Sequence, residues 1–108
     1  MIQRLIEYLK AGGYTPCPNK YSTDIRLNGE FVFNLRDTEE EQPEVLVWCL
    51  EELGRRGWNF DLHNDIETEQ GSPFNDGRNY ELETYAEGRI GIIASGTTMT
   101  AAAIGAVC

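Results

Sequence analysis

Residues 43–63 read PEVLVWCLEELGRRGWNFDLH, and this stretch decides the fold class. Its first two thirds predict an amphipathic helix over residues 43–56, because apolar residues recur at helical spacing and charged residues take the other side. Pro43 suits the first helical position, where its missing N–H has no helical partner in any case. The apolar face that this helix must bury contains Leu46, Cys49, Leu50 and Leu53.

The end of the stretch predicts a turn into a strand. Gly57 can adopt the left-handed conformation that closes a helix, and this closure brings Trp58 back onto Leu53. From Trp58 to His63, apolar and polar residues alternate, as they do in a strand with one buried face. One helix face and one strand face therefore need the same core, and Trp58 is expected to anchor it.

Periodicity and turn residues predict the remaining elements. The sequence shows no internal repeat. The predicted elements are a helix over the first dozen residues, a loop over 14–20, a hairpin over 23–35, an acidic linker over 37–42, a long connection over 64–78, strands over 80–86 and 89–95, and a helix from Thr97 or Thr98 to about Val107.

The hairpin over residues 23–35 turns near Asn28-Gly29. A two-residue loop there would put Ile25 and Phe31 on opposite faces, whereas a three-residue loop over 27–29 puts both on one face. Because a slip of one residue flips every side chain, the apolar pattern should set the register. We therefore predict the longer loop, with Gly29 left-handed in a bulge.

The predicted order is α-β-β-α-β-β-β-α in a single domain over residues 1–108. Short hairpin connections imply a mostly antiparallel five-stranded sheet packed with helices, which is the α+β class. The longest apolar run, residues 45–50, is far too short to span a membrane, and charged residues near the N-terminus argue against a signal peptide.

Charge is distributed unevenly along the chain. The formal net charge is −9, yet residues 37–87 contain fifteen acidic and three basic side chains, a net of −12, while residues 1–36 carry +2. This distribution disfavours direct contact with a nucleic-acid backbone, which requires a basic face, and favours a basic partner. The alternative is that the charge only keeps the protein in solution.

The three cysteines, Cys17, Cys49 and Cys108, have no metal-type spacing. An odd number of cysteines without such spacing is typical of reduced thiols in a cytosolic protein, and Cys49 is expected in the core.

The second half of the chain resembles the small phage and prophage proteins called the phage ABA sandwich domain. The resemblance lies in residues 53–60 (LGRRGWNF), where a helix closes with Gly-Trp and a strand, and in residues 94–98 (ASGTT), which open an alanine-rich helix. Residues 21–25 also echo that family, although here a hairpin and an acidic linker follow them, so the match covers mainly residues 43–108. The resemblance implies a phage context and brings no defined activity with it.

Two other patterns have weaker functional interpretations. Carboxylates and the single histidine recur at every second position in Asp61, His63, Asp65, Glu67 and Glu69. This pattern could bind a divalent metal in a small metal-dependent enzyme, but the solvated side of a strand is the favoured interpretation. The segment 95–98 precedes a helix and could hold an anion on its backbone N–H groups, although a plain helix cap is favoured.

The leading hypothesis is a non-enzymatic phage or prophage accessory protein in the cytoplasm, without metal or cofactor. It would bind and inhibit a basic host protein such as a nucleic-acid-binding defence complex, in the manner of an anti-CRISPR protein and with its carboxylates imitating nucleic-acid phosphates. The alternatives are an immunity protein against a nuclease toxin and the metal-dependent enzyme. The predicted partner-binding residues are Asp37, Glu39, Glu40, Glu41, Glu44, Glu51, Glu52, Asp65, Glu67, Glu69 and Asp76.

Overall fold

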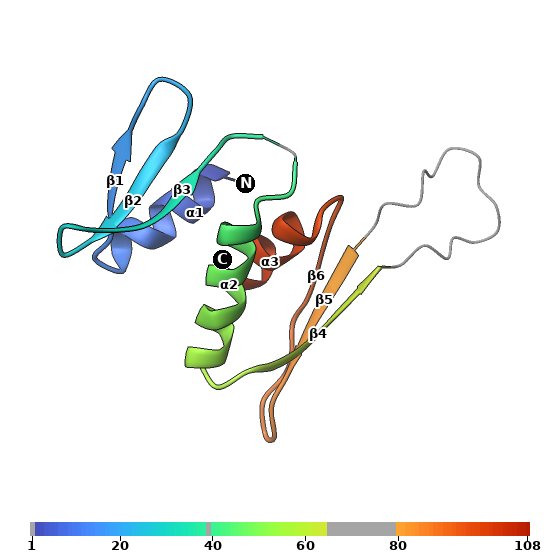
Figure 1. Cartoon of the computed structure of the whole chain (residues 1–108). Helices are drawn as coiled ribbons and strands as arrows, with labels where there is room; N and C mark the ends of the chain where they lie inside the picture. The colour runs from blue at the N-terminus through green and yellow to red at the C-terminus, as the bar shows by residue number, and fades with distance from the viewer. Residues whose placement is uncertain (1, 39, 65–79) are drawn as a thin grey trace, which may run out of the picture.

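The computed structural model describes residues 2–38, 40–64 and 80–108. Within these ranges, three helices and six strands follow one another in the order α-β-β-β-α-β-β-β-α (Figure 1). Their bounds are α1 Ile2–Ala11, β1 Thr15–Pro18, β2 Thr23–Leu27, β3 Glu30–Leu35, α2 Pro43–Arg55, β4 Asn59–Asn64, β5 Tyr80–Tyr85, β6 Ile93–Gly96 and α3 Met99–Val107.

The strands form two separate antiparallel sheets of three strands each, so the single five-stranded sheet and the order predicted from the sequence are wrong. The first sheet has the order β1-β2-β3 and the second has β4-β5-β6. Helices α2 and α3 pack against each other between the two sheets, with α2 toward β3 and α3 toward β5 and β6 (Figure 1). The strands of the two sheets do not pair with each other, because α2 and α3 lie between the sheets.

Strand β1 lies in a segment for which the sequence predicted a loop. That prediction is wrong for β1, although Pro16 and Pro18 cannot donate to a sheet ladder. The structure pairs Pro16 with Ile25 and Pro18 with Thr23, at the edge of the first sheet. An edge strand tolerates proline because one of its sides needs no hydrogen bonds, and the prolines hinder a further strand from adding there.

The hairpin of β2 and β3 has a two-residue loop, so the predicted three-residue loop is wrong. Asn28 and Gly29 both have positive φ, +54° and +83°, as a tight hairpin turn requires. Ile25 pairs with Phe33 rather than Phe31, because a bulge places an extra residue in β3. The bulge restores one apolar face after the short loop and leaves Phe31 exposed.

The helix end predicted at Gly57 is confirmed. Gly57 has a φ of +85°, its N–H donates to Gly54 O at 3.0 Å, and the Trp58 N–H donates to Leu53 O at 3.0 Å. These two bonds satisfy carbonyls that the helix end would otherwise leave without partners. Trp58 itself is only partly buried, and the guanidinium of Arg89 lies 3.7 Å from its ring centroid.

One hydrophobic core joins the helices to both sheets. Cys49 lies in this core, as predicted, and burial raises the pKa of its thiol to about 12. No helix within residues 2–38, 40–64 or 80–108 is long and apolar enough to cross a membrane. The buried apolar residues are Leu5, Leu9, Ile25, Phe33, Leu35, Val45, Trp48, Cys49, Leu53, Leu82, Ala102, Ala103, Ile104, Ala106 and Val107.

Candidate functional site

The predicted partner-binding residues divide into two groups. Glu39, Asp65, Glu67, Glu69 and Asp76 lie outside the residues that the structure describes. The other six lie in the linker between β3 and α2 or on α2 itself, namely Asp37, Glu40, Glu41, Glu44, Glu51 and Glu52.

Glu41 bonds to the start of α3. Its carboxylate accepts hydrogen bonds from the backbone N–H groups of Met99 at 2.6 Å and Thr100 at 2.9 Å, and from the Thr100 hydroxyl at 2.7 Å. The first turn of α3 contains no acidic residue of its own, so Glu41 supplies the negative charge that a helix N-terminus favours. The helix cap favoured for Thr97 or Thr98 is present at Thr98, whose side chain accepts a hydrogen bond from the Ala101 N–H at 2.9 Å.

Gln42 bonds the linker both to the end of β3 and to α3. Its side-chain amide accepts from the Arg36 N–H at 2.9 Å and donates to the Arg36 carbonyl at 2.8 Å. Its own backbone N–H donates to the hydroxyl of buried Thr100 at 2.9 Å. The linker is therefore held to the end of β3 and to α3 at neighbouring residues.

Glu52 and Arg56 together connect the three helices. Glu52 accepts a hydrogen bond from the Tyr8 hydroxyl at 2.6 Å and from Arg55 at 2.8 Å, and Arg56 donates to the Tyr8 hydroxyl and to the Val107 carbonyl of α3. Burial alone would raise the pKa of the Glu52 carboxyl, but the Tyr8 hydrogen bond and the two arginines outweigh it and lower that pKa. Burial and the hydrogen bond to Glu52 raise the pKa of Tyr8.

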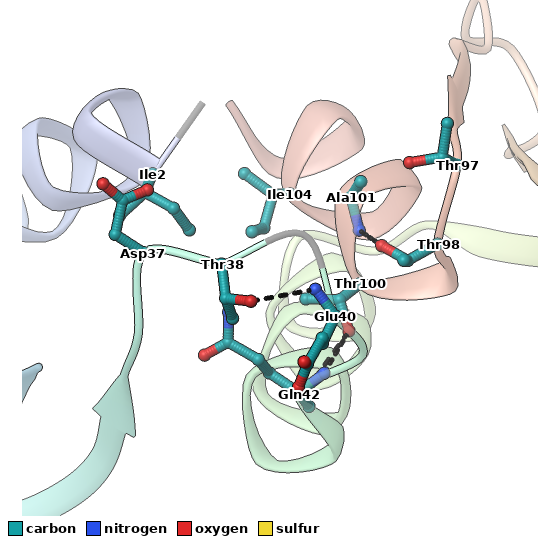
Figure 2. Close-up of a pocket in the computed structure, with 10 residues that line it drawn as sticks. All are labelled: Ile2, Asp37, Thr38, Glu40, Gln42, Thr97, Thr98, Thr100, Ala101 and Ile104. Atoms are coloured by element: carbon teal, nitrogen blue, oxygen red, sulfur yellow. Dashed lines mark hydrogen bonds between the residues drawn. The ribbon is translucent and has the colours of Figure 1, made fainter.

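Asp37 and Glu40 line a hollow of about 530 Å³ between the linker, α1 and α3 (Figure 2). Ile2 from α1 and Ile104 from α3 provide apolar walls, and Figure 2 shows Asp37 beside Ile2 at one side of the hollow. Both carboxylate side chains are exposed, and that of Glu40 lies 4.0 Å from the Arg36 guanidinium. The polar part of the lining consists of Asp37, Thr38, Glu40, Gln42, Thr97, Thr98 and Thr100.

Glu44 and Glu51 flank a second depression, between β3 and α2, which we call the β3–α2 groove. Both glutamates are exposed. The groove has a volume of about 430 Å³, and half of the Val47 side chain is exposed in it. The residues lining it are Val32, Phe33, Pro43, Glu44, Val47, Trp48 and Glu51.

The outer face of the second sheet is a further acidic surface, which the predicted site did not include. Asp61 pairs directly with Glu83, and Glu81 pairs with His63. His63 lies 3.8 Å from Glu83, and no group of three His, Cys, Asp or Glu side chains fit to hold a metal occurs in the part of the chain that the structure describes. The alternation of Glu81 and Glu83 with apolar residues in β5 is the signal that could have revealed this face.

Comparisons with protein-family models, with curated proteins and with solved structures find no match to this chain. The resemblance to the phage ABA sandwich domain therefore stays a prediction from the sequence.

Proposed function

We propose that the protein is a non-enzymatic, cytoplasmic phage or prophage accessory protein that binds and inhibits a basic host protein. The observation that carries this proposal is the hollow lined by Asp37 and Glu40. These two exposed carboxylates and the apolar side chains of Ile2 and Ile104 line the same hollow. A lysine or arginine side chain has a matching composition, with an apolar stem and a charged head.

The internal roles of Glu41 and Glu52 narrow the set of residues that can face a partner. Both carboxylates already accept hydrogen bonds from other parts of the chain. Asp37 and Glu40 in the linker and Glu44 and Glu51 on α2 remain exposed. These four carboxylates are the proposed contacts with a nucleic-acid-binding surface, such as that of a defence complex, where they would stand in for phosphates.

The test is affinity capture from a bacterial lysate, followed by kinetics with the purified partner. The double variant Asp37→Asn/Glu40→Gln should associate with the partner more slowly than the wild type and show a weaker dependence on salt. The control Glu30→Gln/Glu87→Gln removes the same charge from two exposed positions elsewhere. Free nucleic acid should compete with the wild type for the partner.

Two results would refute this function. One is equal association rates for the two double variants and the wild type. The other is binding that neither salt nor nucleic acid weakens, which would make the interface apolar and leave the charge to solubility alone.

A further inference from the structure

Strand β3 is an edge strand of the first sheet. Just beyond its end, the Arg36 N–H and carbonyl are both bonded by the amide of Gln42, as a neighbouring strand would bond them. In a strand, the backbone groups of alternate residues point to the same side, so the N–H and carbonyl of Asn34 point toward this same outer edge. Gln42 thus bonds to the outer edge of β3 at Arg36 in the way that a neighbouring strand would.

The β3–α2 groove runs beside this edge. Val32 and Phe33 line it from β3, and Pro43, Val47 and Trp48 line it from α2, so its floor is apolar. Glu44 and Glu51 stand on the helix side of the groove, two turns apart, which is about 10 Å along the helix axis. An edge strand beside an apolar groove and a helix is the arrangement in which extended peptides add to a sheet.

We propose that the β3–α2 groove binds an extended segment of a basic partner protein, added to β3 as a fourth, neighbouring strand. The main chain of the segment would bond to the outer edge of β3 from Asn34 onward. Its side chains recur on one face about every 7 Å, so flexible lysines or arginines at alternate positions reach both Glu44 and Glu51. Apolar side chains at the intervening positions turn to the opposite face of the segment.

Charge complementarity selects this occupant. A second copy of the chain would bring another acidic surface toward Glu44 and Glu51, since the net charge is −9. The inference rests on the proposed function insofar as it takes the partner to be basic. It deepens that proposal, because it assigns Glu44 and Glu51 to a groove that shares no lining residue with the hollow of Asp37 and Glu40 among those described.

The experiment titrates the isotope-labelled full chain with the peptide acetyl-Lys-Val-Lys-Val-Lys-Val-Lys-amide and follows backbone amide signals by NMR. Chemical shifts should change at Val32, Asn34 and Val47. A peptide with N-methyl groups on alternate residues keeps its charge and side chains but loses main-chain donors. The N-methylated peptide should bind at least about tenfold more weakly than the unmodified peptide. A peptide with glutamate in place of lysine should not bind.

A protein variant tests the same groove. Val47→Lys places a positive charge between Glu44 and Glu51 at a position that is 52% exposed, so the fold should tolerate it. It should weaken peptide binding about tenfold or more. The matched control is Ile90→Lys, at a position that is 92% exposed near the turn between β5 and β6, which should leave binding unchanged.

The outcomes separate this inference from the proposed function. Chemical-shift changes confined to Asp37 and Glu40 would show that the peptide binds in the acidic hollow and not in the groove. Equal binding of the N-methylated peptide would overturn strand addition. Self-association of the protein without peptide, abolished by Val47→Lys, would assign the groove to a second copy and overturn the basic partner. Peptide binding in the groove without any captured host protein would uphold the groove and contradict the proposed function.

Discussion

A helix followed by a three-stranded antiparallel sheet occurs twice along the chain, as α1 with β1–β3 and as α2 with β4–β6. The helices end in the same way, each with a left-handed glycine followed by an aromatic residue. Gly13 has a φ of +92° and Gly57 of +85°. The Tyr14 N–H donates to Leu9 O at 2.9 Å, as the Trp58 N–H does to Leu53 O at 3.0 Å.

The two halves differ in what surrounds this shared turn. Tyr14 packs edge-on against Trp48 in the core, with ring centroids 5.7 Å apart, whereas Trp58 is only partly buried beneath the guanidinium of Arg89. Residues 1–36 carry a net charge of +2 and residues 37–87 carry −12. The same local arrangement of helix, turn and sheet is therefore compatible with surfaces of different charge.

The strongest test of the comparison removes the equivalent buried leucines. Leu9→Ala and Leu53→Ala should each lower the free energy of unfolding by ~2–5 kcal/mol, because both side chains are buried in the one core. Urea denaturation followed by circular dichroism measures this, with exposed Ile90→Ala as a control that should change stability by less than ~0.5 kcal/mol. Two separate transitions in either variant would show that the halves unfold independently.

The turn glycines give the second test. Gly13→Ala should destabilise the protein by ~1 kcal/mol, because alanine is strained at positive φ, and no described atom lies within 4 Å of the added Cβ. Gly57→Ala should cost more, ~1–2 kcal/mol, because its Cβ would stand 3.3 Å from the Arg89 guanidinium. Thermal melts compare them with Gly54→Ala, inside α2, which should be neutral or stabilising. Equal losses of stability for Gly13→Ala and Gly57→Ala would show that the Arg89 guanidinium does not crowd the added Cβ at residue 57.

The sequence predicted the local elements better than their assembly. The helix end at Gly57, the alternation in residues 58–63 and the cap at Thr98 follow from interactions between residues close in the chain, and all three are present. Whether hairpins join into one sheet depends on which surfaces the helices cover, and local patterns do not contain that information. The hairpin register was predicted wrongly because a bulge achieved the same apolar face with a shorter loop.

The candidate site shows the same limit. Nothing in the sequence distinguishes Glu40 from Glu41, because both are acidic residues of the same linker. In the structure Glu40 is exposed, whereas Glu41 bonds to Met99 and Thr100 of α3, which lie 58 and 59 residues further along the chain. Such long-range contacts are invisible to spacing arguments. The apolar groove beside Glu44 and Glu51 also required the structure, because it forms between a strand and a helix that the sequence did not place together.

The third test compares the stability effects of replacing Glu41 and Glu40, which are neighbours in the linker between the two halves. Glu41→Gln should lower stability by ~1–2 kcal/mol, because it removes the charge that accepts three hydrogen bonds at the start of α3. Glu40→Gln should change stability by less than ~0.5 kcal/mol, since its ion pair is exposed. Equal melting temperatures for the two variants would contradict the capping role of Glu41.

The smallest expected effect concerns the contact that joins the two helices at equivalent positions. Tyr8 precedes Leu9 as Glu52 precedes Leu53, and their side-chain oxygens are 2.6 Å apart. The pKa of Glu52 is lower in the folded protein than its ordinary value of 4.5, so its stabilising contribution is fully present above pH 4.5 and is lost as the pH falls through the folded-state pKa. Glu52→Gln should be less stable than the wild type at neutral pH by up to ~1 kcal/mol, and this gap should narrow on acidification. Urea titrations at a series of pH values measure the gap, and Glu51→Gln, on the exposed side of the same helix, controls for net charge. A gap that stays constant through the acidic range would mean that the Tyr8–Glu52 contact contributes through its shape and not through the ionised carboxylate.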